Sequence, residues 1–436
     1  MIHLISLLLT WIALSITMYL VSLQHIMVSL GVILLWWYGM VQCMIHLANS
    51  MLVVFGVVLL VTLLLYINRL LILTIDGLVL IHILQLSTCV VTMVQDYLIF
   101  FTLFEILLLV MFMYSLVVSK IYRSIYSQYM LIVYTLLGSS MMLLAMCSEY
   151  SVLGTTTSTI AWGPSSINSM VHVYSMLLVW GFFSKIPCYP FHVWLTEAHV
   201  EITTEGSVLL AGIYLKVGTI GLYRYAITMY EYSWIWWTPC YIIVLGVGSV
   251  VTGWWLVKQV DAKRYIALCS IIHMQIMILV VFCTHHSVGI VGVLLQMVMH
   301  SWIAMLLFIC VGYVYDIQGT RILLYLHTYS VYTTTWMLVL LCNMGVPCSA
   351  SFLSEILLLR ILIPTISWIA ILVLIINSGI AITGLYVWLL TTSGKDASTG
   401  WAYTNPSLQG SWVCMLLVSI IIMSIRISCM LYTVML

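Results

Sequence analysis

The stretch that decides the fold reads FFSKIPCYPFHVWLTEAHVE over residues 182–201 and continues as GSVLLAGIYLKVG over residues 206–218. Two lysines, Lys185 and Lys216, stand inside these largely apolar segments, and Pro187 closely follows the first lysine. Proline removes a backbone donor and clashes with the preceding helical turn, so at membrane depth the freed carbonyls need protein or water partners. The stretch therefore predicts a broken membrane helix that carries a buried charge.

The whole chain has the composition of a membrane protein. Of its 436 residues, 64% are hydrophobic and 6% are charged, whereas soluble domains average about 45–50% apolar and about 25% charged residues. Thirteen Lys and Arg against twelve Asp and Glu give a formal net charge of +1, which offers no electrostatic basis for nucleic-acid binding. This composition excludes a soluble globular protein and predicts a lipid environment without a nucleic-acid partner.

The hydropathy pattern predicts an all-α, polytopic fold of about fourteen transmembrane helices, because each span needs roughly 20 apolar residues and a short connection. The predicted spans are 1–23, 25–47, 50–73, 76–95, 97–118, 126–147, 168–190, 203–226, 236–258, 263–283, 286–313, 328–364, 366–392 and 411–435. The longest polar interval, 148–168, predicts a loop outside the membrane. The N-terminus enters an apolar run without the Arg-rich stretch of an organelle transit peptide, which favours insertion from inside an organelle or in a bacterium.

Basic residues predict the orientation of the spans, because short loops rich in Lys and Arg stay on the cytoplasmic or matrix side. The odd-numbered connections hold most of them: Arg69, Lys120, Arg123, Lys258, Lys263, Arg264, Arg321 and Lys395. With an even number of helices, both termini are predicted to face the opposite, outer compartment.

Two of the spans contain a short similar sequence. Lys185-Ile-Pro187-Cys188 in the seventh span resembles Gly345-Val-Pro347-Cys348 in the twelfth. Two broken helices at corresponding places are typical of transporters built from inverted repeats. Because the similarity extends over four residues alone, chance is an equally good explanation of it.

Six of the ionisable residues inside predicted spans, where charge is costly, form a possible series. They are Glu105, Lys185, Lys216, His273, His300 and Glu355. Four uncompensated charges at helix centres would cost on the order of 10–14 kcal/mol, so these side chains are expected to face the bundle interior, pair or neutralise. Histidine suits a proton relay because it takes up and releases protons near neutral pH.

A Glu105–Lys185 pair could act as a pump element. At about 4 Å and an effective dielectric constant of about 20, the attraction is roughly 4 kcal/mol. Changing the separation of the two groups would therefore switch the lysine between holding and yielding its proton. The alternative is a purely structural pair that locks two helices together.

Several other residues have plainer interpretations. His82 and His172 are interpreted as satisfied or interfacial histidines, and Arg360 as either a partner of Glu355 or an interfacial anchor. Single cysteines in apolar runs behave as small hydrophobes. Because the sequence has no CxxC, GxGxxG, P-loop or HExxH motif, it predicts no metal site and no nucleotide cofactor on this chain.

The opening stretch, with its KxP, HxWL, AHVE and GS elements and a lysine in the next helix, closely resembles the antiporter-like (Mrp-type) subunits of respiratory complex I. Further matches are Phe101-Thr-Leu-Phe104-Glu105, Tyr134-Thr-Leu-Leu-Gly138-Ser139, the run from Lys258 to Met274, His300, and Pro347 to Glu355. The resemblance covers roughly 97–360 well and the flanks only by hydropathy.

The resemblance implies a proton-translocating membrane-arm subunit with inverted five-helix repeats at helices 4–8 and 9–13, broken in helices 7 and 12. The implied division is 1–75 for peripheral helices 1–3, 76–227 and 228–395 for the repeats, and 396–436 for helix 14. It also implies that Glu105 and Lys185 form the modulating pair and that Lys216 is the central relay residue of the proton path. Glu355 is the implied terminal proton site, and His273 and His300 lie between Lys216 and Glu355.

The implied setting is the mitochondrial inner membrane, with both termini on the intermembrane-space side. The chain would belong to an enzyme without redox chemistry of its own, with FMN, iron–sulfur clusters and ubiquinone in partner subunits. The implied partners are other membrane-arm subunits, including antiporter-like subunits 2 and 5, and phospholipids such as cardiolipin. Two alternatives stay open: a subunit of a multisubunit cation/proton antiporter, and a non-conducting spacer of the membrane arm.

The sequence departs from the family pattern near these motifs. Thr196 and Thr203 stand where the family usually has proline, Glu197 replaces a lysine, Glu205 a small residue, and Ser354 a glycine. Glu197 and Glu205 put the charge of the local loop in doubt.

Overall fold

The computed structural model describes residues 75–94, 96–118, 122–154, 156, 169–226, 234–283, 287–326, 330–347 and 349–392, which all belong to one compact unit, Val57–Leu436. The predicted spans 1–23, 25–47, 50–73 and 411–435 lie outside the described residues, as do Arg69, Lys120, Lys395 and the side chains of His82 and His172.

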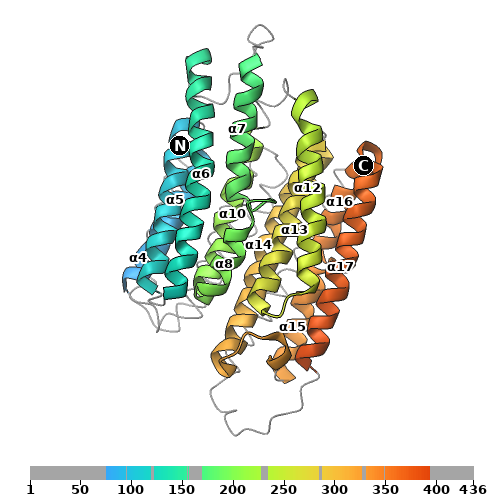
Figure 1. Ribbon diagram of the computed structural model, residues 1–436. Coiled ribbons are helices and arrows are strands. Elements are labelled where there is room, and N and C mark those ends of the chain that lie inside the picture. Colours follow the sequence, from blue (N-terminus) through green and yellow to red (C-terminus); the bar gives the residue numbers. More distant parts are fainter. Residues whose placement is uncertain are drawn as a thin grey trace, which may run out of the picture. The chain divides into compact units, whose positions relative to one another are not determined.

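Helices make up nearly all of the described part (Figure 1). They are α4 (Ile75–Met93), α5 (Tyr97–Val118), α6 (Tyr122–Leu153), α7 (Ser169–Lys185), α8 (Val193–Glu201), α9 (Thr204–Leu209), the π-helix η3 (Leu210–Tyr214), α10 (Leu215–Gly221), the π-helix η4 (Leu222–Ala226), α12 (Trp234–Val257), α13 (Ala262–Cys283), α14 (Ser287–Gln318), the 3₁₀ turn η5 (Leu323–Tyr325), α15 (Ser330–Asn343), α16 (Ala350–Thr365) and α17 (Ser367–Thr392).

These helices lie where apolar runs predicted spans between 76 and 392, and they end where polar residues, glycine or proline interrupt those runs. Seven helical segments in the described part are long and apolar enough to cross a membrane. The all-α, multi-pass character of the chain is therefore confirmed, while the total of fourteen helices stays a prediction.

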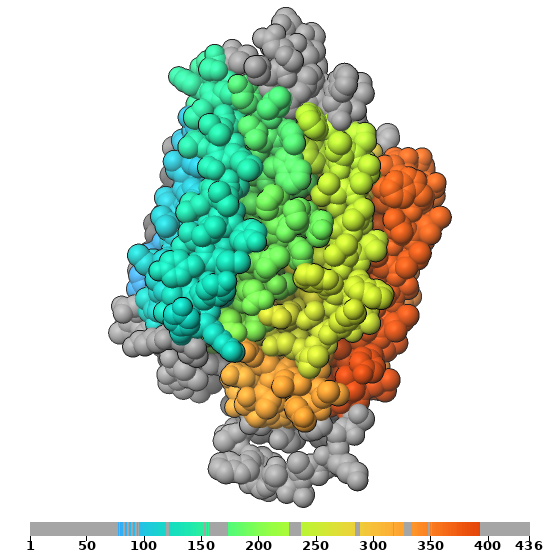
Figure 2. Space-filling view, in the orientation of Figure 1, coloured from blue at the N-terminus to red at the C-terminus, as the bar shows by residue number. Residues whose placement is uncertain are grey.

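Burial separates central from peripheral helices. Nearly every described residue of α13 is buried, including its polar side chains. By contrast, α6 and α12 expose large apolar side chains such as Leu137, Leu144, Val247 and Trp254, and both helices lie on the outer face that Figure 2 shows. An apolar outer surface, with the polar side chains buried inside the bundle, is the arrangement that lipid favours.

The first predicted helix break is confirmed between α7 and α8. Pro187 has no N–H, and the amide of Cys188 bonds to the carbonyl of Phe183, five residues back, at 3.3 Å. The carbonyl of Ser184 accepts instead from the indole Nε1 of Trp194 at 2.8 Å. A side chain from the next segment thus satisfies a group that the break frees, as membrane depth requires.

The second predicted break, between α15 and α16, has a similar hydrogen-bonding pattern. The amide of Val346 bonds to Leu341, again five residues back, at 3.2 Å. The carbonyl of Cys342 loses its helical partner and accepts from the amide of Gly345 at 3.3 Å and from the Ser351 hydroxyl at 2.5 Å. Ser349 caps α16 by accepting from the amide of Phe352 at 3.3 Å. Each break is therefore closed by a side chain located shortly after it in the sequence.

The crossing of α6 and α7 depends on Gly181. An added Cβ there would lie 2.1 Å from Cγ of Met142 and 2.7 Å from the backbone oxygen of Gly138. We expect Gly181→Ala to destabilise the protein by about 1–3 kcal/mol, the usual cost of overpacking. Gly246→Ala is the control, because nothing lies within 4 Å of an added Cβ and alanine favours the helix by about 1 kcal/mol. Thermal unfolding of the purified protein measures both, and equal unfolding temperatures would contradict the prediction.

Candidate functional site

Lys185 ends α7 and is 1% exposed. Its Nζ donates to the backbone oxygen of Phe104 at 2.6 Å. The amine also lies 3.1 Å from the centroid of the Phe104 ring and 4.9 Å from that of Tyr214. Two aromatic faces and a carbonyl therefore stabilise a cation in this apolar site, and the C-terminal end of α7 adds to the attraction.

Glu105 follows Phe104 on α5 and is near enough for its charge to act on Lys185 and on Tyr214. The two side chains of the predicted pair do not form a direct ion pair, and Nζ of Lys185 bonds to the Phe104 carbonyl. The Oε1 atom of Glu105 is buried and has no hydrogen-bond partner among the described residues. The structure thus places Glu105 beside the lysine without a salt bridge between them.

Lys216 lies on α10, between the two π-helical segments η3 and η4, and is 2% exposed. In η3 the amide of Leu215 donates to the carbonyl of Leu210, five residues back. The carbonyl of Ala211 accepts from Nζ of Lys216 at 2.5 Å. Single-turn π segments often occur at functional sites, and this one supplies a backbone partner for a buried lysine.

Nζ of Lys216 also lies 2.9 Å from Nδ1 of His300. Lys216 and His300 are 84 residues apart and belong to the two predicted repeats. The distance is within the range that permits direct proton transfer between the two nitrogens. Which nitrogen donates depends on the protonation of the pair.

A polar series continues from His300 towards Glu355. The rings of His300 and His273 have centroids 5.8 Å apart. Nδ1 of His273 lies 3.4 Å from Nε2 of Gln296, and the Ser354 hydroxyl donates to Oε1 of Gln296. Ser354 precedes Glu355 on α16, so the contacts lead to the neighbour of that carboxylate.

Glu355 is packed between two elements. Its Oε2 accepts from Nδ2 of Asn377 on α17 at 3.2 Å. On the other side lies Gly345, in the helix break, where an added Cβ would come within 2.9 Å of three carboxylate atoms. Gly345 has a φ of +66°, which favours glycine for the backbone as well. Arg360, an alternative partner in the sequence analysis, is exposed on α16.

The structure brings four of the six predicted residues, Lys216, His273, His300 and Glu355, into one polar region, with Lys185 and Glu105 near Tyr214. Sequence reasoning missed the residues that connect them: Phe104, Tyr214, Gln296 and Asn377. Gln296 stands four positions before His300, on the same helical face, and Asn377 interrupts an apolar run. Both signals were visible in the sequence.

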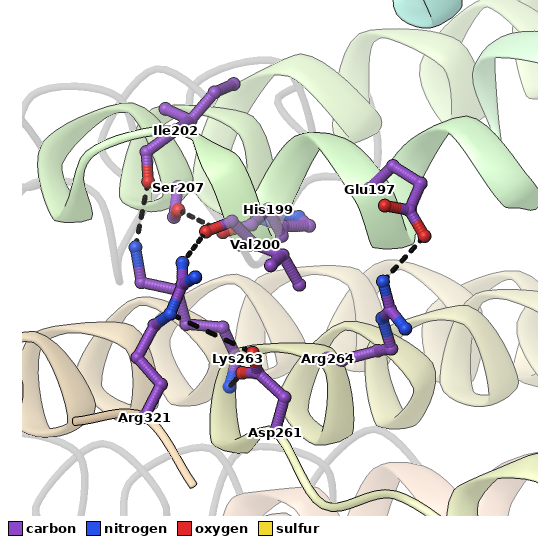
Figure 3. A network of polar contacts seen from close by, with 9 residues as sticks. All are labelled: Glu197, His199, Val200, Ile202, Ser207, Asp261, Lys263, Arg264 and Arg321. Atoms are coloured by element: carbon purple, nitrogen blue, oxygen red, sulfur yellow. Dashed lines mark hydrogen bonds and ion pairs between the residues drawn. The ribbon is translucent and has the colours of Figure 1, made fainter. Parts of the chain in front are cut away.

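A charged cluster, hereafter the end cluster, joins α8 to the start of α13 and to the segment after α14 (Figure 3). Nη2 of Arg264 pairs with Oε1 of Glu197 at 2.7 Å. Nζ of Lys263 donates to the carbonyl of Ile202 at 2.8 Å. Arg321 donates to the carbonyl of Val200 and lies 3.8 Å from Oδ2 of Asp261. The end cluster consists of Glu197, Asp261, Lys263, Arg264 and Arg321.

Three departures from the family pattern make hydrogen bonds or ion pairs in the described part. Glu197 pairs with Arg264, Thr203 caps α9 by accepting from the amide of Gly206 at 3.5 Å, and Ser354 bonds to Gln296. Glu205 is buried and its charge acts on Lys263. The loop charge that these glutamates put in doubt therefore lies next to cations of α13.

Within the described ranges, no group of three or more His, Cys, Asp and Glu side chains could hold a metal ion. The chemistry that the polar series offers is the transfer of protons between a buried amine, imidazoles and a carboxylate.

The sequence pattern of the transmembrane family described as NADH:quinone oxidoreductase/Mrp antiporter matches residues 94–381. The chain belongs to this family. The resemblance drawn from residues 182–218 is thereby confirmed.

A curated relative resembles this antiporter-type chain in sequence, and two solved structures resemble it in fold. NADH-ubiquinone oxidoreductase chain 4 of Acanthamoeba castellanii is 36% identical over 306 residues, which are 68% of this chain and 60% of the relative. This chain thus spans about three fifths of that curated relative's length. A chain of the archaeal membrane-bound sulfane sulfur reductase has a TM-score of 0.79 at 18% identity, covering 88% of this chain and 80% of its own. A chain of respiratory complex I from Thermus thermophilus has a TM-score of 0.73 at 18% identity, and the match covers 86% of this chain and 80% of the Thermus chain.

The packing of Gly345 against Glu355 can be tested with a matched pair of glycines. Gly345 and Gly319 both have positive φ, at +66° and +70°, but nothing lies within 4 Å of an added Cβ at Gly319. Alanine costs about 1–2 kcal/mol of backbone strain at either position. We expect Gly345→Ala to be about 1–3 kcal/mol more destabilising than Gly319→Ala, because only the former displaces a carboxylate. Thermal unfolding compares them, and matching losses of stability would show that the carboxylate moves freely.

Proposed function

We propose that this chain conducts protons across the mitochondrial inner membrane as a membrane-arm subunit of NADH:ubiquinone oxidoreductase. The observation that carries the proposal is the buried contact of 2.9 Å between Nζ of Lys216 and Nδ1 of His300. A lysine and a histidine in direct contact can exchange a proton, and inside a membrane such groups most often mark proton or ion paths. Family membership and the curated relative support the same assignment.

The relay proposed here runs from Lys185 through Lys216, His300 and His273 to Glu355. Lys216 gives a proton to Nδ1 of His300, and the amine is then neutral until it is reloaded. Gln296 and Ser354 orient the path beyond His273. Buried atoms such as Nε2 of His273 and Oδ1 of Asn377 have no protein partner among the described residues. Because buried polar groups are normally hydrogen-bonded, we expect water to complete the path.

The conformational change that drives pumping is proposed to act on Glu105. Its carboxylate influences Lys185 without bonding to it, so a shift of α5 would change their attraction. A close pair is worth roughly 4 kcal/mol at an effective dielectric constant of about 20. A neighbouring subunit that moves Glu105 would therefore make Lys185 hold or release its proton.

The architecture proposed for this function divides the chain into 1–75, the inverted repeats 76–227 and 228–395, and 396–436. The similar closure of the two helix breaks supports this division. Both termini are proposed to face the intermembrane space. The proposed partners are membrane-arm subunits, including antiporter-like subunits 2 and 5, and phospholipids such as cardiolipin. Redox chemistry with FMN, iron–sulfur clusters and ubiquinone is assigned to other subunits.

The family description supports a second candidate, a subunit of a multisubunit cation/proton antiporter. Purification separates the two, because a complex I subunit travels with flavin and iron–sulfur partners and an antiporter subunit with small membrane proteins. A non-conducting spacer is the third possibility, for which neutral substitutions at Glu105, Lys216 and Glu355 would alter assembly alone.

Lys216→Met in the assembled complex tests the relay. Methionine keeps much of the side-chain volume and removes the exchangeable proton, so we expect proton translocation to fall about a hundredfold, the lower range for a lost proton-transfer group. Lys258→Met is the control, because Lys258 lies exposed over the Trp254 ring at the end of α12. Proton translocation and NADH oxidation are measured together, with assembly checked on native gels. Full pumping at unchanged stoichiometry would reject the relay role of Lys216.

A further inference from the structure

Two polar groups near the Glu105–Lys185 pair are buried without a hydrogen-bond partner, and their chemistry is complementary. Oε1 of Glu105 can accept a hydrogen bond, and the hydroxyl of Tyr214 can donate one. Neither atom has a partner among the described residues. Buried polar groups nearly always make at least one hydrogen bond, and a buried tyrosine hydroxyl usually finds one. A donor and an acceptor left open in one region therefore indicate a bond that forms in another arrangement of the helices.

Tyr214 is the last residue of the π-helix η3 and is 0% exposed. The centroid of its ring lies 4.9 Å from Nζ of Lys185. The ring of Trp194 meets it edge to face, with centroids 6.2 Å apart and planes inclined by 80°. Nε1 of Trp194 is in turn bonded to the Ser184 carbonyl. The side chain that closes the first helix break therefore also holds the Tyr214 ring beside the lysine.

The charge of Glu105 acts on both Lys185 and Tyr214. The carboxylate is thus within electrostatic range of two groups that can donate to it, an ammonium and a phenol hydroxyl. The ammonium donates to the Phe104 carbonyl at 2.6 Å, and the phenol donates to no described group. Glu105 therefore stands between two donors and is bonded to neither of them.

The Thr135 hydroxyl on α6 also acts on the Tyr214 hydroxyl. It already donates to the carbonyl of Leu131 at 2.6 Å. As an acceptor it is neutral, whereas hydrogen bonds to an ionised carboxylate are roughly twice as strong as those between neutral groups. The phenol therefore favours Glu105 over Thr135 once the carboxylate comes within reach.

A carboxylate that moves away from an ammonium inside the bundle needs a new donor. An ion separated from its partner in a buried site is strongly destabilised, because nothing replaces the lost interaction. The hydroxyl of Tyr214 offers a replacement within the same site. It gives Glu105 a second favourable position, so that the separation from Lys185 has a defined end point.

We propose that the Tyr214 hydroxyl is the alternative partner of Glu105 and defines the position that the carboxylate takes when it separates from Lys185. In that position the phenol donates a hydrogen bond and keeps its own proton, while Lys185 releases its proton into the relay described above. When the carboxylate returns, the ammonium is stabilised again. Tyr214 is thus a positioning residue that acts through Glu105. The inference rests on the proposed function, which supplies the movement of Glu105.

Tyr214→Phe in the assembled complex tests the inference, because phenylalanine keeps the ring beside Lys185 and Trp194 and removes the hydroxyl alone. Since this hydroxyl has no partner in the structure, assembly on native gels and the unfolding temperature should be maintained. Proton translocation per NADH oxidised should fall about tenfold, the effect of one lost hydrogen bond to a charged group on an equilibrium.

Tyr265→Phe is the matched control. Tyr265 is also a buried tyrosine, and its hydroxyl lies 3.4 Å from Oγ1 of Thr383 on α17. This variant should pump at the parent rate, although it loses a hydroxyl with a partner. An equal loss of pumping in both variants would overturn the inference, as would a lower unfolding temperature of Tyr214→Phe, which would make the hydroxyl a packing group.

Infrared difference spectra separate positioning from packing. Between the oxidised and the NADH-reduced complex, the phenol C–O band of Tyr214, identified by its loss in Tyr214→Phe, should shift in the parent and stay unchanged in Glu105→Gln. No shift in the parent, or the same shift in Glu105→Gln, would overturn the inference. Full pumping by Tyr214→Phe while Lys216→Met is inactive would overturn the inference alone. Full pumping by both variants would overturn the proposed function with it.

Discussion

The hydrogen bond between a buried lysine amine and a histidine ring organises the polar interior of this bundle. Lys216 and His300 come from helices on either side of the predicted repeat boundary, and neither side chain has access to bulk solvent. In an apolar surrounding, each group needs the other, since an isolated ammonium would be strongly disfavoured. The π-helical turn η3 adds the Ala211 carbonyl as a second acceptor. Local backbone irregularity and a contact across 84 residues thus stabilise one proton-bearing amine together.

The two helix breaks also help to place polar groups inside the bundle. Proline at 187 and the turn around Gly345 interrupt spans that would otherwise be continuous, and side chains close the exposed carbonyls. Each break also positions an ionisable group: Lys185 at the end of α7, and Glu355 against Gly345. The neighbouring regular helices supply their partners, the Phe104 carbonyl of α5 and the Asn377 amide of α17. The breaks therefore place the ionisable groups, and the regular helices around them supply partners.

The end cluster shows how local departures from a family pattern fit a common fold. Glu197 finds Arg264, and Glu205 lies near Lys263, so the added negative charge meets positive charge from α13. Exposed pairs of this kind contribute about 0–1 kcal/mol each. Their importance is therefore positional, because they hold the end of α8 against α13 and the segment after α14.

Hydropathy and proline placement alone predicted the described spans between 76 and 392, both helix breaks and the series of ionisable residues inside the spans. These features are local: a long apolar run selects a membrane helix, and a missing N–H ends it. The partners of the ionisable residues were decided only in three dimensions. Lys185 bonds to the Phe104 carbonyl, 81 residues away, instead of to the Glu105 carboxylate, and Gln296 and Asn377 meet His273 and Glu355 only in the folded chain. Which side chains meet depends on how each helix is rotated and shifted against its neighbours, and packing between distant segments sets those variables.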